Sequence, residues 1–302
     1  MTIWLNNGAE MIKLFKINSL SLVSLTRLHA GRSLYLVVLT AQKMSTDERP
    51  LILVTNDDGI YSPGITFLSR VASRFGRIVV VAPDKPQSGM GHAITINATL
   101  RIQKTNYHNA EIEYSCSGTP VDCVKMAVNH ILKRRPDLVV SGVNHGSNSS
   151  INVIYSGTMS AAIEGALEGT PSIGFSLCDY SIEADFTQAE KYVASLIEHA
   201  LTKKMPKGVC LNVNIPKLGA EDIKGIKIVR QAKANWVERF EERKDPYGRN
   251  YYWLTGEFVN FEPESVDTDE WALANGYISV VPTQSDMTAH RILNDLKYFE
   301  TA

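Results

Sequence analysis

The sequence has few cysteines and no surplus of charge of either sign. Its four cysteines are scattered without a Cys-x-x-Cys spacing. This argues against a zinc ribbon and a disulfide framework, and it suits small buried thiols in a reducing cytoplasm, where we expect the protein to reside. With 31 basic and 32 acidic residues among 302, the formal net charge is −1. Such a balanced chain lacks the basic stripe that binds a nucleic-acid polymer.

Long hydrophobic runs are also missing. Near the N-terminus the longest apolar stretch, residues 34–39, is far shorter than the roughly 20 residues of a membrane-spanning helix. Basic residues interrupt the apolar ones there, unlike the pattern of a signal peptide, and no acidic residue lies between Glu10 and residue 47. We expect residues 1–46 to be an extension that is disordered or lies upstream of a true start at Met44, with an organelle transit peptide as the alternative. We expect no membrane association.

From Pro50 onward, apolar runs alternate with stretches of helical periodicity. This alternation is typical of βαβ units. The expected strands are residues 51–55, 78–82 and 138–141, and the expected helices are residues 63–75, 120–132 and 158–167. We therefore predict an α/β fold with a Rossmann-like, mostly parallel sheet and flanking helices.

The pattern changes after residue 208. Strands are expected at 209–214 and 226–230, followed by an aromatic and charged stretch that ends at Trp253. Exposed aromatic clusters usually mark contacts, so the stretch is either a β-rich arm that packs on another subunit or a satellite core within one chain. We predict one domain over residues 47–302, with a core at about 50–230 and the arm at about 231–302.

Two adjacent carboxylates give the strongest chemical signal. Asp57 and Asp58 follow the apolar run at 51–55, and open α/β sheets bind ligands at the carboxyl ends of their strands. Two neighbouring anions need compensation. Oxygen-only ligands suit Mg²⁺, Mn²⁺ or Ca²⁺ better than zinc. The alternative is a turn closed by Gly59 in which both side chains only cap the next helix.

Two further strand ends carry polar side chains. Ser88 and His92 lie in a Gly-containing loop after the strand at 78–82, so either could close over a bound group. This loop is neither a dinucleotide fingerprint nor a Walker loop, and His92 could equally be a surface residue. Asn144 follows the strand at 138–141 and offers a neutral oxygen for a Mg²⁺ or Mn²⁺ shell.

Ser156, Gly157 and Thr158 directly precede or begin the helix at 158–167. Helix N-termini favour phosphate, and helix capping is a compatible reading of the same residues. Three strand ends and a helix N-terminus together predict a metal-dependent site for phosphoryl transfer or phosphate hydrolysis.

Several ordered motifs carry a family resemblance. They are Thr-Asn-Asp-Asp-Gly-Ile at 55–60, Val-Ala-Pro-Asp at 81–84, Gln-Ser-Gly at 87–89, Ser-Gly-Thr-Pro-Val-Asp-Cys-Val at 117–124, Ser-Gly-Val-Asn at 141–144 and Tyr-Ser-Gly-Thr at 155–158. The chain resembles the SurE-type 5′-nucleotidases, the stationary-phase survival protein family, from about residue 50 to near the C-terminus. The pair Lys85-Pro86 departs locally from the family pattern, which leaves substrate preference open.

The resemblance implies hydrolysis of nucleoside 5′-monophosphates by a homodimer or homotetramer assembled through the C-terminal arm. It also implies one divalent ion, Mg²⁺ or Mn²⁺. The implied metal ligands are Asp57, Asp58, Ser88 and Asn144.

We expect metal-assisted attack by water, with Asp57 and Asp58 as catalytic carboxylates and Asp57 as the modest base. His92 is the candidate proton donor to the leaving ribose oxygen. The residues expected to hold the phosphate oxygens are Asn56, Ser156, Gly157 and Thr158. One alternative is a phospho-aspartate enzyme of the haloacid dehalogenase type, although the two aspartates at this strand end are adjacent and lack the Asp-x-Asp spacing of those enzymes. The other is a nucleotide-binding regulatory protein without catalysis.

Overall fold

The computed structural model describes residues 2–6, 11–15, 49–181 and 183–300. Contacts divide the chain into two units, Met1–Glu48 and Arg49–Ala302. In the first unit β1 (Thr2–Asn6) pairs antiparallel with β2 (Met11–Phe15). The rest of the predicted extension at 1–46 lies outside the described residues. No helix within the described ranges is long and apolar enough to cross a membrane.

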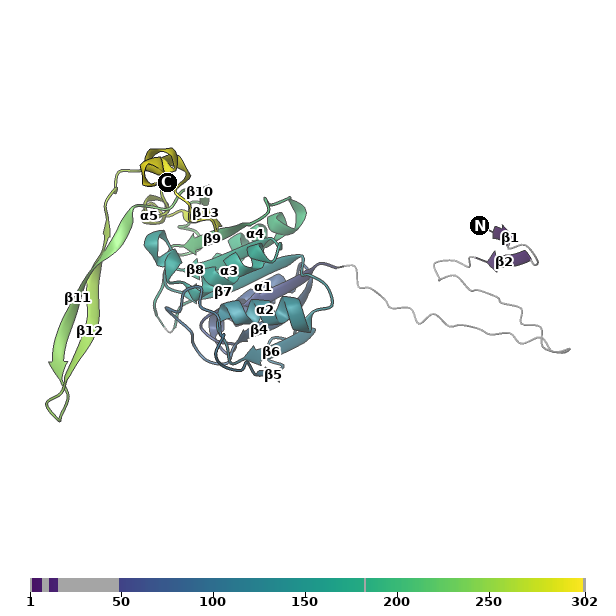
Figure 1. Ribbon diagram of the computed structural model, residues 1–302, viewed down its shortest axis with the longest axis horizontal. Helices are drawn as coiled ribbons and strands as arrows, with labels where there is room; N and C mark the ends of the chain where they lie inside the picture. Colours follow the sequence, from purple (N-terminus) through teal and green to yellow (C-terminus); the bar gives the residue numbers. More distant parts are fainter. Residues whose placement is uncertain (1, 7–10, 16–48, 182, 301–302) are drawn as a thin grey trace. The chain divides into compact units, whose positions relative to one another are not determined.

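The second unit is built on a nine-stranded sheet with the order β10-β13-β9-β8-β7-β3-β4-β6-β5 (Figure 1). Its strands are β3 (Leu51–Thr55), β4 (Arg77–Pro83), β5 (Ile102–Lys104), β6 (Ile112–Cys116), β7 (Leu138–His145), β8 (Ser172–Leu177), β9 (Val209–Ile215), β10 (Ile226–Ile228) and β13 (Ile278–Gln284). The strands from β9 to β6 in this order run parallel, whereas β13 is antiparallel to β9 and β5 to β6. The predicted mostly parallel α/β sheet is therefore confirmed.

Helices cover both faces of the sheet because its central strands are apolar on both sides. On β3, Ile52 and Val54 pack into one hydrophobic cluster, and Leu51 and Leu53 pack into another on the opposite face. The α-helices are α1 (Pro63–Ala72), α2 (Pro120–Met126), α3 (Gly157–Leu167), α4 (Glu190–Thr202) and α5 (Asp269–Ala274). The first cluster takes in α1 and α4, while α2 and α3 contribute to the second.

Short helical segments complete the unit. They are the π-helical η1 (Ala127–Ile131) and the 3₁₀ segments η2 (Ser150–Ile154), η3 (Phe186–Ala189), η4 (His290–Ile292) and η5 (Asn294–Phe299). The helix expected at 120–132 is thus divided, because the α-helical bonding of α2 gives way to a π-helical turn at Ala127.

The position of β3 in the sheet determines where a ligand can bind. β4 lies on one side of β3 and β7 on the other. The chain therefore leaves β3 in one direction and returns on its opposite side, which makes the carboxyl end of β3 a topological switch point. The segments that follow β3, β4 and β7 all begin at this edge, and these are the segments that carry the predicted site residues.

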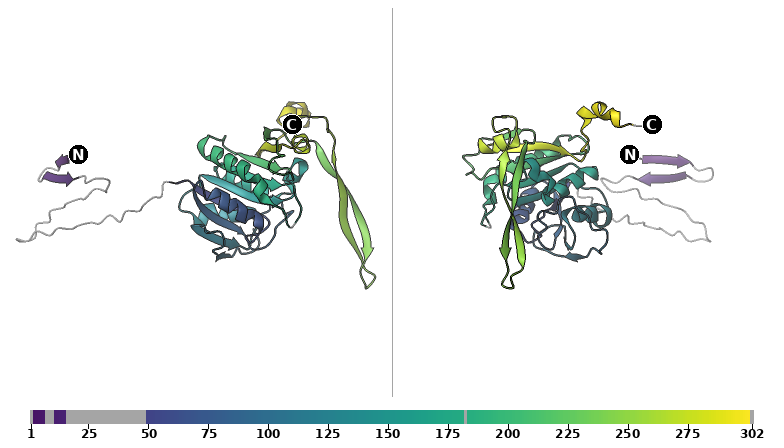
Figure 2. Two further views of the ribbon diagram at one scale, coloured as in Figure 1. Left: turned by 180° about the vertical axis from the view of Figure 1, so that it is seen from behind. Right: turned by 60° about the vertical axis from the view of Figure 1, so that its left-hand side comes forward.

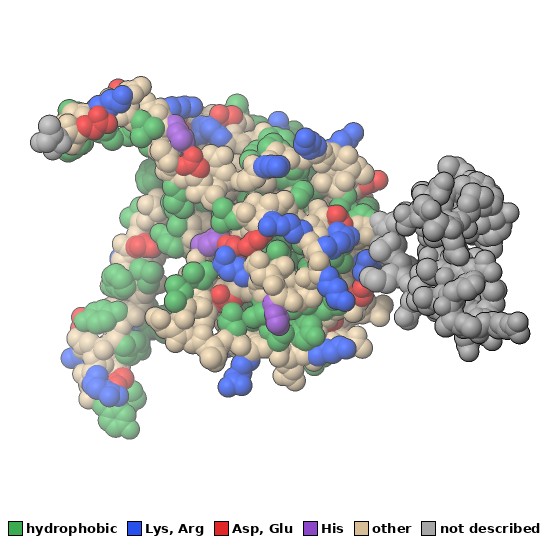
Figure 3. Space-filling view, turned by 45° about the vertical axis from the view of Figure 1, so that its right-hand side comes forward, with side chains coloured by type: hydrophobic (Ala, Val, Ile, Leu, Met, Phe, Trp, Pro, Cys, Tyr) green, Lys and Arg blue, Asp and Glu red, His purple; other side chains and the backbone are tan. Residues whose placement is uncertain are grey.

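A long hairpin, β11 (Ala234–Lys244) and β12 (Asn250–Asn260), projects from the sheet as an antiparallel ribbon (Figures 1 and 2). Most of its large apolar side chains are solvent-exposed, and Tyr247 at the tip is 84% exposed. Hydrophobic side chains are visible along this projecting arm in the space-filling view (Figure 3). They do not form a satellite core within the described chain.

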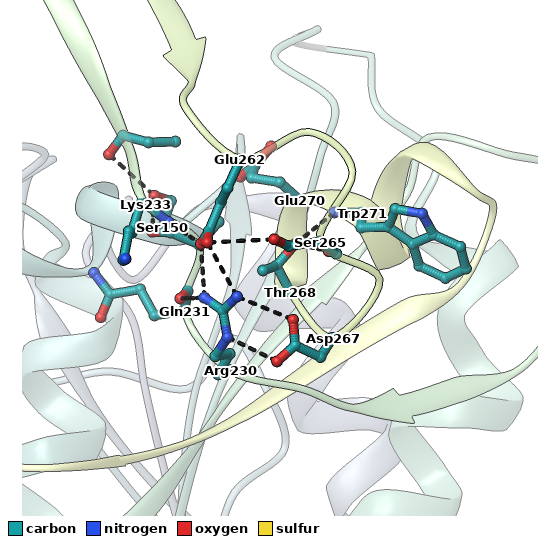
Figure 4. Close-up of polar contacts among 12 residues, drawn as sticks. Ser150, Arg230, Gln231, Lys233, Glu262, Ser265, Asp267, Thr268, Glu270 and Trp271 are labelled. Atoms are coloured by element: carbon teal, nitrogen blue, oxygen red, sulfur yellow. Dashed lines mark hydrogen bonds and ion pairs between the residues drawn. The ribbon is translucent and has the colours of Figure 1, made fainter.

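Ion pairs hold the base of the arm. Arg230, just before β11, donates to Glu262 and Asp267, which follow β12, at 2.6 and 2.8 Å (Figure 4). Glu262 also accepts the backbone N–H of Lys233 at 2.7 Å. The two ends of the hairpin are therefore joined where it leaves the sheet.

The arm predicted at about 231–302 is divided in the structure. The hairpin fills its first part, but β13 returns to the main sheet between β10 and β9. Ile278 and Val280 of β13 are fully buried and belong to the core cluster that contains α1 and α4. Burial of these side chains explains why this segment is part of the sheet.

Candidate active site

Asp57 and Asp58 lie directly after β3, on a turn braced by Asn56. The Asn56 amide donates to the Gly59 carbonyl at 2.9 Å and to Ser62 Oγ at 2.8 Å. Ser62 occupies the N-cap of α1, so neither carboxylate caps that helix. The capping alternative is excluded for α1, and the two carboxylates stay at the edge of the sheet.

The two carboxylates carry charge that the protein itself does not balance. Burial, and then the charge of Asp58, raise the pKa of Asp57 to about 6, although hydrogen bonds from Thr158 oppose the shift. Burial also raises the pKa of Asp58, although the backbone N–H of His145, 3.3 Å from Asp58 Oδ2, and the charge of His145 oppose this shift. Among the residues the structure describes, no Lys or Arg forms an ion pair with either. This arrangement favours a bound cation.

The donor set is small and consists of oxygen. In the described ranges no group of three or more His, Cys, Asp and Glu side chains could bind a metal. A cation at this edge would therefore need neutral oxygen ligands in addition to the two carboxylates. Mg²⁺ and Mn²⁺ accept such mixed oxygen shells, with water or substrate oxygens completing them.

Asn144 lies at the end of β7, beside Asp58. Its Nδ2 donates to the Gly146 carbonyl at 2.9 Å, while its Oδ1 has no hydrogen bond within the described part of the chain. The register between β7 and β8 shifts between Ser141 and Asn144, an irregularity of the kind that re-aims side chains next to active sites. The free amide oxygen is thus available to a ligand.

Unpartnered oxygens gather where β3 and β7 end. Thr55 pairs with Ser141 across these strands. The hydroxyls of both residues and Oδ1 of Asn56 are buried and have no hydrogen-bond partner among the described residues. Buried polar atoms normally have partners. Such an orphaned group beside two uncompensated carboxylates fits a site built for a cation and its water.

Ser88 lies on an exposed loop that crosses this edge. The Gln87 N–H donates to the Asp57 carbonyl at 2.7 Å, and the Gly91 N–H donates to the Tyr155 carbonyl at 3.1 Å. The loop therefore runs from the Asp57 turn to the residue before Ser156. The structure brings Ser88 between two of the predicted site segments.

The N-terminus of α3 packs directly on Asp57. Ser156 is the N-cap and accepts the Met159 N–H at 3.0 Å, and Thr158 Oγ1 donates to Asp57 Oδ1. A Cβ on Gly157 would lie 2.7 Å from Asp57 Cβ and 2.9 Å from its Oδ2. Only glycine permits this approach, which places the positive end of the helix at the carboxylates.

His92 lies just beyond this edge, on the same loop as Ser88. Its Nε2 is 3.0 Å from Glu164 Oε2, and Lys125 Nζ is 2.5 Å from the other oxygen of Glu164. Sequence reasoning found His92 but missed Glu164 and Lys125, and it also missed the contact of the His145 backbone N–H with Asp58. A glutamate on an Ala- and Gly-rich buried helix was the signal for Glu164.

The fold and this edge define an α/β protein with paired carboxylates and a helix N-terminus at the switch point of its sheet. Comparison with known proteins gives the family. The sequence model of the family described as Survival protein SurE matches residues 52–238. The chain belongs to the SurE family.

Relatives and a solved structure agree with this assignment. A protein of Flavobacterium psychrophilum named 5′-nucleotidase SurE is 63% identical over 253 residues, covering 83% of this chain and 98% of the relative. Its namesake in Flavobacterium johnsoniae is 62% identical over 251 residues, covering 83% and 96%. The crystal structure of the SurE protein from Aquifex aeolicus is 40% identical with a TM-score of 0.73, covering 83% of this chain and 100% of that one.

Proposed function

We propose that the chain is a 5′-nucleotidase that hydrolyses nucleoside 5′-monophosphates to nucleoside and phosphate with the help of one Mg²⁺ or Mn²⁺ ion. The observation that carries this proposal is the uncompensated Asp57–Asp58 pair packed against the N-terminus of α3. The names of its relatives support the same substrate class.

The residues proposed to hold the ion are Asp57, Asp58, Ser88 and Asn144. All four offer oxygen, and the free Oδ1 of Asn144 adds a ligand without adding charge. When bound, a divalent ion supplies Lewis-acid polarisation of a phosphoryl oxygen and of the attacking water. The chain's own residues orient the phosphate and accept the proton.

Asp57 is proposed as the base that accepts the proton of the attacking water. Thr158 Oγ1 holds its Oδ1, while its Oδ2 lies at Gly157, at the start of α3. A phosphate bound to the N–H groups of Ser156 and Gly157 would therefore lie beside this carboxylate, and Thr158, whose hydroxyl and backbone N–H both act on Asp57, would fix the carboxylate next to it. The proposed base and the proposed phosphate site are thus held next to each other, so that a water between them would be oriented for attack.

The structure changes how Asn56 and His92 could act, and both roles remain proposals. Both amide N–H groups of Asn56 are used by Gly59 and Ser62, so Asn56 supports the phosphate site chiefly by bracing the turn beneath it. Nε2 of His92 faces Glu164, which leaves Nδ1 as the atom that could protonate the leaving oxygen.

We expect phosphate release from adenosine 5′-monophosphate to exceed release from the 3′ isomer. The 5′-phosphate is attached to a primary carbon at the edge of the nucleoside, so it can reach the N-terminus of α3 without burial of the ribose. Release is measured with both isomers at equal concentration and with Mn²⁺ present. Faster release from the 3′ isomer would contradict the proposed substrate class.

We propose that the arm assembles the chain into a homodimer or homotetramer. Side chains alternate between its two faces. The register of β11 and β12 places Trp236, Phe240, Tyr252, Leu254 and Phe258 on one face, and the smaller apolar set Val237, Tyr251 and Trp253 on the other. Such an exposed apolar face is typical of a subunit contact.

The double variant Phe240→Glu, Leu254→Glu places charge on this face. We expect it to form a particle of lower mass, that of a smaller assembly. The matched control is the double variant Arg239→Glu, Thr255→Glu, because these two residues pair on the other face of the hairpin. Sedimentation or light scattering measures the mass. Equal masses for the two double variants would contradict the assignment of the apolar face.

A further inference from the structure

Glu164 is a buried acid outside the Asp57–Asp58 pair. It lies on α3 among small buried residues such as Ala161 and Ala166, and it is 3% exposed. Burial alone would raise its pKa, but the hydrogen bonds and charges of His92 and Lys125 hold that pKa below its ordinary value. The side chain is therefore a buried carboxylate with two partners.

A buried charge is costly unless it is paired. An apolar side chain would pack at this position of α3 without that cost, so the contacts that Glu164 makes are the place to look for its role. Glu164 connects three parts of the fold, since Lys125 lies on α2, Glu164 on α3 and His92 on the loop that carries Ser88. A carboxylate only accepts hydrogen bonds, so His92 Nε2 is the donor in this pair.

The loop that carries Ser88 needs such a contact because its two glycines allow its backbone several conformations. Gly89 and Gly91 have φ values of +76° and +56°, and a Cβ on Gly89 would meet nothing within 4 Å. Between the backbone contacts of Gln87 and Gly91, only residues 88–90 span the edge. The side chain of His92, the next residue, reaches from this loop to a buried partner.

We infer that Glu164 is a positioning residue: through His92 it holds the loop so that Ser88 stays at the edge of the sheet that carries Asp57 and Asp58. The inference rests on the proposed function, in which Ser88 is a metal ligand. Lys125 fixes the carboxylate from the other side. The loop contact thus links the interior of α3 to the ligand set.

The test begins with the metal-free protein. In His92→Ala, hydrogen exchange of the amides at 87–93 is expected to accelerate, while exchange in the strands of the sheet stays unchanged. The conservative His92→Gln, whose amide can still donate to Glu164, is expected to restore slow exchange. His130→Ala is the matched control, since that histidine is exposed on η1. Unchanged exchange in His92→Ala would overturn the inference.

Mn²⁺ calorimetry then tests whether the effect passes through Ser88. Loss of a group that orients a ligand typically weakens metal binding by about 10–100-fold, and we expect His92→Ala to fall in this range. In a Ser88→Ala background, His92→Ala should add little further weakening, because the two act as one unit. Additive losses would overturn the inference and leave the proposed function intact. If Ser88→Ala binds Mn²⁺ normally, the ligand assignment and this inference both fail.

Kinetics separate positioning from proton donation. A phenolic phosphate such as p-nitrophenyl phosphate has a leaving group that needs no acid. If His92 acts by holding the loop, His92→Ala lowers the activity on this ester and on a nucleotide by similar factors, and high Mn²⁺ restores much of the activity. If nucleotide hydrolysis falls and hydrolysis of the phenolic ester is unchanged, His92 acts solely as the proton donor proposed above and does not hold the loop, so the inference is wrong. Because His92 is partly exposed, its variants should fold, and the test does not depend on a substitution of the buried Glu164.

Discussion

Asp57→Asn should lower kcat on nucleoside 5′-monophosphates by about 10²–10⁴-fold, the usual contribution of a general base. The amide keeps the shape of the side chain and can still accept the Thr158 hydroxyl, but it can neither take a proton nor neutralise a cation. Steady-state phosphate release measures the effect. Full metal-dependent activity in this variant would contradict the role assigned to Asp57.

The same substitution should stabilise the metal-free protein at pH 8. The pKa of Asp57 is raised to about 6 in the folded state from the ordinary 3.8, so the folded protein binds more protons than the unfolded chain between these values. Its stability therefore decreases as pH rises through this window, and the amide removes that loss. Thermal unfolding in EDTA at pH 8 and pH 4 should show a gain only at pH 8.

Asp137→Asn is the matched control for the activity measurement; it also removes an ion pair with Arg134 at 3.0 Å, so it is not a control for stability. Asp137 lies at the opposite, amino end of β3, where its carboxylate accepts the Leu51 N–H at 2.7 Å. An asparagine oxygen can accept the same bond. We expect activity to be retained in this variant, so a similar loss in both variants would mean that the effect of Asp57→Asn is not specific to the site.

Gly157→Ala should lower kcat/KM by roughly 10²-fold, which is the order of effect that a displacement of about 1 Å at a reacting group produces. The new methyl group would lie 2.7 Å from Asp57 Cβ, so either the carboxylate or the start of α3 has to move. Both carry the proposed chemistry. The measurement is phosphate release by protein whose folding is verified by circular dichroism.

Gly165→Ala provides the comparison on the same helix. A Cβ there would lie 2.4 Å from Ser172 Oγ and 2.9 Å from Val139 Cγ2. The added methyl group therefore crowds strands β7 and β8 and does not touch Asp57 or Asp58. It should lower the melting temperature but retain kcat in the folded fraction. If Gly165→Ala and Gly157→Ala lose kcat equally, crowding of α3 in general explains the loss.

The parts of the fold with strong local signals were predictable. The apolar run at 51–55 is β3, and the strand end with Asp57 and Asp58 lies at the switch point of the sheet. The Ala-rich helix is α3, which begins at Gly157. Short apolar runs and turn residues encode these elements within a few residues of sequence.

Other elements depend on contacts that the local sequence does not contain. The strand β8 and the helix α4 had no predicted counterpart, and β13 joins the sheet by pairing with a strand about 70 residues earlier in the chain. The partner of His92 is likewise Glu164, 72 residues away. Pairing between distant segments is decided by burial and register, and single-sequence patterns do not report it.

The candidate site was predictable in its residue types but not in its supports. The Asp pair, Asn144 and the residues at 156–158 follow from their places at strand and helix ends. The bracing of the turn by the Asn56 amide and the contact of Thr158 with Asp57 required the structure, because they join side chains through space. These supports determine which atoms remain free for a ligand.

Phosphate release with and without EDTA tests the central claim most directly. The protein is given a saturating nucleoside 5′-monophosphate with Mn²⁺, then excess EDTA, then Mn²⁺ again, beside Asp58→Ala in the same series. We expect release that stops with EDTA, returns with Mn²⁺ and is absent from Asp58→Ala. Release that EDTA leaves unchanged, or a tight nucleotide complex that never yields phosphate, would contradict a metal-dependent nucleotidase.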